Sequence, residues 1–143
     1  MIVLKSLGER MEYYAPSLLR MGLALVYLWF GISQIMSPLL FTQYIPDFLT
    51  ALLDNSELIV LSSGIIVSLL GLLLLLGLMT KIVAWILVFH MIIVLNGIGY
   101  NSMGVKSFGI LIGTITIAMT RNDSLRLDNK IKFGKKKDVI SFD

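Results

Sequence analysis

The sequence predicts an all-α membrane protein, a four-transmembrane-helix antiparallel bundle with a short amphipathic segment on its outer face. The first observation is composition: 57% of the 143 residues are hydrophobic, only 15% are charged, and the mean hydropathy is +0.87. Soluble domains are nearer half apolar and a quarter charged. The second observation is that four long stretches, residues 21–46, 58–80, 82–105 and 107–120, carry no charged side chain. This pattern excludes a disordered chain and a nucleic-acid-binding domain, and it makes the lipid bilayer the first expected partner.

The four uncharged stretches predict four spanning helices. A span needs about 20 apolar residues, because about 30 Å of hydrocarbon is crossed at about 1.5 Å per residue. The first three stretches meet this length, and the fourth meets it if its helix begins before Lys106, whose long stem can reach the surface. We expect helices over residues 17–36, 58–79, 82–98 and 105–120. Together they form a transmembrane domain over 17–120, between an interfacial or cytoplasmic segment, 1–16, and a basic cytoplasmic tail, 121–143.

The distribution of cations predicts the orientation in the membrane. Lysine and arginine gather on the cytoplasmic side of membrane proteins. Four spans place Lys5, Arg10, Arg20, Lys81 and the seven cations of the tail on one side, and only Lys106 on the other. Three spans would send the tail cations across the membrane. The sequence therefore predicts a multi-pass protein of the cell membrane with both termini in the cytoplasm.

Two connections between the spans have features that predict their structure. The outer connection, residues 37–57, carries three acidic side chains and no cation. Pro46 suits the first turn of a helix, after which four apolar side chains fall on one side. We expect a short amphipathic helix lying on the outer face or capping the bundle, with its apolar side formed by Phe48, Leu49, Leu52 and Leu53. The inner turn at residues 80–81 is tight, which predicts an antiparallel hairpin of the second and third spans.

Small and polar residues recur at helical spacing within three of the spans. Spacings of three and four residues place side chains on one helix face. Such faces serve close helix packing, the interpretation we favour, or they surround a small polar cavity. The faces are Arg20, Ala24, Tyr27, Gly31 and Gln34 in the first span, Gly64, Ser68 and Gly71 in the second, and Lys106, Gly109, Gly113, Thr116 and Thr120 in the fourth.

His90 lies near the middle of the third span and is the candidate functional residue of the interior. Ionisable groups at that depth are costly and rarely face lipid, so we expect a neutral imidazole that points inward. It either relays protons or binds a quinone carbonyl, or it is a structural histidine bonded to Tyr27, Gln34 or a backbone carbonyl. Arg20 stands at the inner mouth of the first span, where we expect a headgroup anchor rather than a substrate clamp.

The residue types that the chain lacks exclude several kinds of catalytic and metal site. The chain has no cysteine, which excludes disulfides, thiolate catalysis, zinc–thiolate sites and iron–sulfur clusters within it. One histidine cannot build a multi-histidine haem or copper site, and we expect no metal site. No aspartate or glutamate lies within the four spans, which argues against proton-coupled transport and general acid–base catalysis. We therefore expect no catalytic residue, and we incline against an enzyme.

Three segments resemble DoxX-like membrane proteins. They are the run Arg-Met-Gly-Leu-Ala-Leu-Val-Tyr-Leu-Trp-Phe-Gly-Ile-Ser-Gln ending at Gln34, followed by Pro38 and Tyr-Ile-Pro46; the glycine-punctuated segment 64–81; and residues 105–113. The resemblance implies a four-helix membrane bundle. Some relatives are small subunits of thiosulfate:quinone oxidoreductase, and others associate with redox or oxidative-stress systems. Three ionisable family positions are neutral or softened here: Gln34 replaces a lysine, an acidic residue is missing near Val67 or Ser68, and Lys106-Ser107 replaces an Arg-Asp pair.

These observations lead to one expected function and two alternatives. We expect a DoxX-like, non-catalytic membrane subunit or scaffold associated with a redox or quinone-linked system. The first alternative is a quinone-binding oxidoreductase subunit, similar to that of thiosulfate:quinone oxidoreductase, with His90, Gln34 and Tyr27 on the quinone oxygens and Arg20 and Lys106 as further candidates. The second is a small-solute transporter that works as an oligomer. Quinone is the only cofactor that these alternatives imply, and the expected partners are a redox-complex subunit or a second copy, with no nucleic acid.

Overall fold

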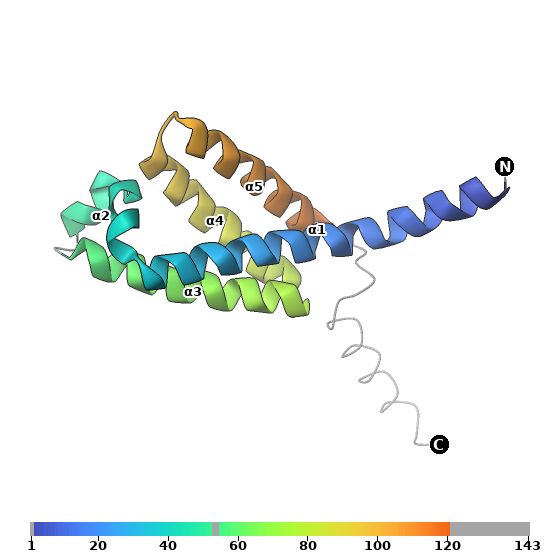
Figure 1. The fold of residues 1–143 in the computed structure, drawn as a ribbon, viewed down its shortest axis with the longest axis horizontal. Coiled ribbons are helices and arrows are strands. Elements are labelled where there is room, and N and C mark those ends of the chain that lie inside the picture. Colours follow the sequence, from blue (N-terminus) through green and yellow to red (C-terminus); the bar gives the residue numbers. More distant parts are fainter. Residues whose placement is uncertain (1, 53–54, 121–143) are drawn as a thin grey trace, which may run out of the picture.

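The chain folds into helices throughout the part that the structure describes, residues 2–52 and 55–120 of a computed structural model (Figure 1). This confirms the all-α class, because no strand occurs within those ranges and four helices are long and apolar enough to cross a membrane. The predicted basic tail, 121–143, lies outside the described residues. The elements in order are α1 (Ile2–Met36), the 3-10 helix η1 (Pro38–Tyr44), α2 (Asp47–Leu52), α3 (Ser56–Leu76), α4 (Thr80–Ile98) and α5 (Ser102–Met119).

Helix α1 is longer than a single span requires. Its 35 residues correspond to about 52 Å at 1.5 Å per residue, whereas the hydrocarbon core is about 30 Å thick. Figure 1 shows its N-terminal part extending beyond the other helices. Burial inside the bundle begins at Ser17, and residues 13–15 are exposed. The segment 1–16, which we expected beside the membrane domain, is therefore continuous with the first span from Ile2 onward.

The connection between α3 and α4 is a three-residue turn that glycine makes possible. Helix α3 ends at Gly77, whose φ of 71° is left-handed and suits a residue without a Cβ atom. The amide of Leu78 then donates to the carbonyl of Leu73 at 3.0 Å, and Met79 is also left-handed with a φ of 47°. The hairpin is as expected, although its turn spans residues 77–79 rather than 80–81. We call this side of the bundle the turn end.

The opposite side, here called the loop end, contains η1, α2 and the turn between α4 and α5. Gly99 ends α4 with a φ of 68°. The side chain of Asn101 then accepts hydrogen bonds from the amides of Met103 and Gly104, both at 2.9 Å, which caps the start of α5. Because this cap starts the helix at Ser102, before Lys106, α5 reaches 18 residues and the length of a span.

The closest helix pairing is that of α1 with α3, and glycines permit it. A Cβ atom at Gly31 would stand 2.8 Å from the carbonyl oxygen of Gly64, and one at Gly64 would stand 2.9 Å from the carbonyl oxygen of Gly31. Both distances are shorter than real Cβ contacts, so the two backbones touch. The glycines of the stripes predicted on the first two spans do serve close packing, whereas Tyr27 and Gln34 of the first stripe line a cavity. Helix α4 packs mainly on α5, and the bundle consists of two helix pairs.

The face predicted for the fourth span is mostly wrong, and its clearest packing member is Gly113, where a Cβ atom would stand 3.1 Å from the Leu23 side chain of α1. Lys106, Gly109 and Thr116 are exposed, and a Cβ atom at Gly109 would meet nothing within 4 Å. The threonines on this face need no partner helix, because the Thr116 hydroxyl donates to the carbonyl of Ile112 in its own helix at 2.9 Å. The buried face instead consists of Gly104, Ser107, Leu111, Thr114, Ile117 and Ala118.

The two helix pairs meet in a hydrophobic core that occupies the half of the bundle nearer the turn end. Its members include Ala24, Leu74, Ala84 and Leu87, none of which exposes any surface. Large apolar side chains are exposed on the outside of the bundle; one of them, Trp29, is 74% exposed. Such a surface matches lipid rather than water. The molecule is a membrane protein with a dry core in one half, and the other half holds the cavity described next.

Candidate functional site

A cavity of about 290 Å³ lies at the loop end of the bundle, between the two helix pairs. Residues of α1, η1, α3, α4 and α5 line it, together with Ile45, Pro46 and Leu49 around the start of α2. Small-molecule sites usually occupy about 300–1,000 Å³, are mostly apolar and carry a few polar groups. This cavity stands at the lower end of that range and is the candidate functional site.

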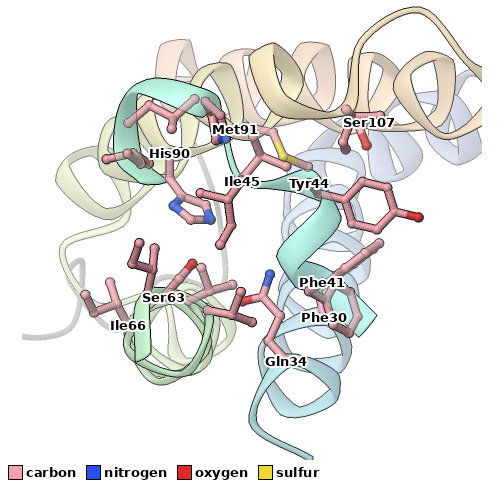
Figure 2. Close-up of a pocket in the computed structure, with 18 of the residues that line it drawn as sticks. Phe30, Gln34, Phe41, Tyr44, Ile45, Ser63, Ile66, His90, Met91 and Ser107 are labelled. Carbon is pink, nitrogen blue, oxygen red and sulfur yellow. The ribbon is translucent and has the colours of Figure 1, made fainter. Parts of the chain in front are cut away.

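The cavity is walled mainly by apolar and aromatic side chains. Phe30 of α1 and Phe41 and Tyr44 of η1 stand together on one side of it, and the Tyr44 hydroxyl points away from the cavity (Figure 2). The rings of Phe41 and Tyr44 meet edge to face with their centroids 6.4 Å apart. Within residues 2–52 and 55–120, no charged side chain lines the cavity. The interior is therefore suited to an uncharged, largely apolar molecule.

Gln34 supplies the clearest polar group. Its amide, carried by the last turn of α1, points into the cavity (Figure 2). Its Oε1 atom is buried and has no hydrogen-bond partner within the part of the chain that the structure describes. A buried acceptor without a partner costs free energy, about 1–3 kcal/mol. A molecule that donates a hydrogen bond in the cavity would remove this cost.

His90 brings a second polar group from α4. The half-buried imidazole faces the cavity, with the Ser63 hydroxyl of α3 on the other side (Figure 2). Over residues 2–52 and 55–120, no hydrogen bond joins His90 to Gln34, to Tyr27 or to a backbone carbonyl. The imidazole points inward, as predicted. The hydrogen bond that would make it a purely structural histidine is not formed. Both ring nitrogens remain available to a bound molecule.

Tyr27 lines the cavity but its hydroxyl is already used. The Tyr27 hydroxyl lies 2.7 Å from Oγ1 of Thr114, and the Thr114 hydroxyl donates its own proton to the carbonyl of Ile110 at 2.7 Å. Tyr27 must therefore be the donor in its bond to Thr114. This bond ties α1 to α5 across the interior. Sequence reasoning missed Thr114, although its spacing from Ser107 and Leu111 places all three on one face.

Arg20 and Lys106 both lie away from the cavity. Arg20 is only 2% exposed, and its guanidinium donates to the carbonyls of Leu74 and, at 2.8 Å, Leu75. The expected headgroup anchor is thus wrong: the last carbonyls of a helix lack partners within it, and Arg20 satisfies two of them at the end of α3. Lys106 is exposed and does not line the cavity.

Residues 44–49, here called the roof, cover one side of the cavity and lie against the last turn of α4. A Cβ atom at Gly97 would collide with the carbonyl oxygen of Tyr44 and approach the Pro46 nitrogen at 3.0 Å, so the backbone of the connection lies directly against this helix. Leu49 of α2 faces the cavity, whereas Phe48 is 54% exposed. The short helix after Pro46 therefore caps the bundle, one of the two positions expected for it, while η1 was not anticipated. The apolar side predicted for the short helix is wrong at Phe48, and the side chains of Leu52 and Leu53 lie outside the described residues.

Comparison with known proteins agrees with this architecture. The family model described as DoxX matches residues 15–98, more than half of the chain. The match covers α1 from Ala15, the roof, α3 and α4, and thus nearly all of the cavity wall; it does not reach residues 105–113, whose resemblance stays a prediction. Neither the curated proteins nor the solved structures gave a match. On the strength of the family match, the chain belongs to the DoxX family.

Proposed function

We propose that this chain is a membrane subunit of a redox system that holds the ring of a quinone in the loop-end cavity. The observation that carries the proposal is the buried, unpartnered amide oxygen of Gln34, which faces the same apolar cavity as His90. Among the functions that the sequence suggested, this favours quinone binding over a scaffold without a ligand. A polar group left unpaired in an otherwise apolar site is a cost that a matching ligand recovers.

The two polar side chains suit both redox forms of a quinone. The ring oxygens of an oxidised quinone only accept hydrogen bonds, and both the Gln34 amide NH₂ and a protonated ring nitrogen of His90 can donate to them. A reduced quinol instead carries hydroxyl groups that donate, and the free Oε1 of Gln34 is an acceptor for one of them. An amide at this position supports binding of either form without itself changing charge.

The residues that line the cavity favour binding of a quinone over catalysis of its oxidation or reduction. Moving two electrons and two protons to or from a quinone needs groups that exchange them, and acid–base catalysis usually uses a carboxylate or histidine of suitable basicity. Of the described residues that line the cavity, only His90 is a candidate, and no carboxylate accompanies it among them. We therefore assign electron transfer to a partner subunit in a redox complex.

The proposal also places the cavity toward the outer face of the cell membrane. Exposed Lys81 marks the turn end, and by the excess of cations on the cytoplasmic side this end and both termini lie inside. The loop end carries acidic Asp47 and Glu57 and only one cation, Lys106. The quinone ring would then be bound in the outer half of the bilayer.

The test compares quinone binding by the parent with that of cavity variants. His90→Leu and Gln34→Leu remove the polar groups, and Phe89→Leu is the matched control, because Phe89 neighbours His90 but is 67% exposed and does not line the cavity. We expect short-tailed quinone to raise the unfolding temperature of the parent and of Phe89→Leu. At 100 times the Kd the gain is about 2.7 kcal/mol. Both cavity variants should lose it.

Two results would overturn the proposal. One is a parent whose unfolding temperature does not respond to quinone and whose lipid extract holds no more quinone per phospholipid than the membrane it came from. The other is an unchanged response in both cavity variants. Where a leucine variant does not fold, His90→Met and Gln34→Met replace it, since an unbranched apolar side chain also removes the polar group and adapts more easily to the space.

A further inference from the structure

We propose that the cavity opens sideways to the bilayer between α3 and α4, and that its ligand is a ring lipid whose apolar tail stays outside in the membrane. This inference rests on the proposed function and adds the route and the ligand class. It starts from residues that line the cavity and are also exposed on the outside of the bundle. Such residues stand at the mouth of a cavity.

The mouth is marked by side chains on both helices. Ser62 and Ile66 of α3 line the cavity and are exposed, Ile66 to 53%. Facing them from α4, His90 and Ile93 line the cavity and are half-buried. In Figure 2, His90 and Ile66 stand on the side of the cavity opposite the aromatic group. Small and aliphatic side chains border this side, so an elongated molecule can pass.

The helix arrangement explains why an opening exists there. The turn at residues 77–79 holds α3 and α4 together at the turn end only. Toward the loop end, α3 follows α1 and α4 follows α5, because those pairings are the more extensive ones. Figure 1 shows α4 leaving the line of α3. The two helices therefore part as they approach the cavity.

The other sides are covered. The rings of Phe30, Phe41 and Tyr44 close the side opposite the mouth (Figure 2), and the buried Pro46 lies in the roof. Among the residues that the structure describes, the remaining lining residue with an exposed side chain is Met103 of α5, at 39% exposure. An opening at Met103 is the rival route, and the experiment below includes it.

The depth of the mouth in the bilayer and the volume of the cavity indicate the class of ligand. Ser62 and Ile66 follow Ser56, the first residue of α3, by six and ten positions, about 9 and 15 Å along the helix. The mouth therefore lies within the hydrocarbon of one leaflet, which is about 15 Å deep. A cavity of 290 Å³ holds a ring head but not a long tail as well. The tail would leave through the mouth and lie among lipids.

The absence of cysteine makes a reversible test possible. In Ser62→Cys, a benzyl methanethiosulfonate adduct blocks the mouth, and a reducing agent removes it from the same protein. Leu69→Cys is the matched control, because Leu69 is 58% exposed on α3 and does not line the cavity; Met103→Cys tests the rival route. The measurement is the rate at which detergent-solubilised protein takes up decyl-tailed quinone. We expect a decrease of about tenfold or more for modified Ser62→Cys, since gating a site acts on the association rate, and recovery after reduction.

A second measurement concerns the tail. Because the tail remains in lipid before and after binding, the Kd expressed per quinone dissolved in the bilayer should be the same for decyl-tailed and short-tailed quinones in liposomes. The Kd per total quinone should decrease with tail length, because each CH₂ adds about 0.8 kcal/mol to partitioning. A bilayer-based Kd that changes with tail length would overturn the assignment of the tail.

The outcomes separate the two proposals. If the parent binds no quinone, the proposed function and this inference both fail. If the parent binds quinone and modified Ser62→Cys takes it up at the unmodified rate, or only modified Met103→Cys is slowed, the proposed function stands and the α3–α4 mouth is overturned. Slowing at Ser62 that reduction reverses, without slowing at Leu69 or Met103, supports the mouth.

Discussion

The contact between α1 and α3 allows the effect of a single methyl group to be worked out. In Gly31→Ala the new Cβ atom would stand 2.8 Å from both the carbonyl oxygen of Gly64 and the amide nitrogen of Ser68. Ordinary contacts begin at 3.4 Å, so the two helices must separate locally by about 0.6 Å. The methyl group would also collide with the Ser68 hydroxyl, which can rotate, but the two backbone atoms cannot rotate away. Overpacking of this kind costs about 1–3 kcal/mol.

The matched control lies in the same helix and has the opposite expected sign. A Cβ atom at Gly22 would meet nothing within 4 Å, so Gly22→Ala adds helix propensity without a clash. That gain is about 1 kcal/mol at most. Gly31→Ala gains the same helix propensity, so this gain cancels between the two variants. Their free energies of unfolding should thus differ by the overpacking cost, about 1–3 kcal/mol, with Gly31→Ala the less stable.

The assay is unfolding of the purified protein in mixed micelles of rising denaturant content, followed by circular dichroism. We expect the midpoint to decrease for Gly31→Ala and to stay or increase for Gly22→Ala. Gln34 follows Gly31 by one helical turn and lines the cavity, so quinone binding should weaken as well in Gly31→Ala. Equal midpoints for the two variants would refute the close backbone contact.

Three further expectations follow from other contacts. Gly97→Ala should displace the connection at Tyr44, because the added Cβ atom collides with that carbonyl, and proteolysis within residues 37–55 should become faster. Tyr27→Phe should lower the free energy of unfolding by only about 0.5–1 kcal/mol, measured by denaturant titration, because Thr114 keeps its bond to its own helix. Alkaline phosphatase fused after Asp143 should be inactive and a fluorescent protein fused there should be bright, because we place this terminus in the cytoplasm.

Each of these expectations has its own control or contrary result. Gly109→Ala, at a glycine with no neighbour within 4 Å, should leave proteolysis unchanged, and a similar increase there would remove the argument from Gly97. Tyr100→Phe, on a fully exposed ring, should have no effect; a loss as large as that of Tyr27→Phe would speak against the bond to Thr114. An active phosphatase after Asp143 would reverse the proposed orientation.

The spans were predictable from sequence because the bilayer imposes one simple requirement on each of them. The predicted ends differ from those of the structure by no more than about three residues, apart from the N-terminal extension of α1. The early start of α5 has a local signal, Asn101, which caps the helix four residues before its predicted start at residue 105. Likewise, Gly77 signals the end of α3.

It was harder to predict which face of a span packs against its neighbours, because α5 carries two stripes of small and polar residues. Gly109 and Thr116 fit a packing face as well as Ser107 and Thr114 do, and sequence spacing does not say which stripe meets the neighbours. The cavity was only partly foreseen for a related reason. Gln34 was named from the spacing of its helix face and His90 from its depth, but the roof and the lining residues Ser62 and Ser63 depend on how far two helix pairs diverge, which no local pattern records.

The asymmetry between the two ends of the bundle has a mechanical consequence. At the turn end, Arg20 ties α1 to the last carbonyls of α3, and the Gly77 turn ties α3 to α4, so three helices share a fixed pivot there. Any widening that admits a guest must grow with distance from this pivot. Protection of backbone amides against deuterium should therefore change most in η1 and α2 when a guest is present, and least beside Gly77.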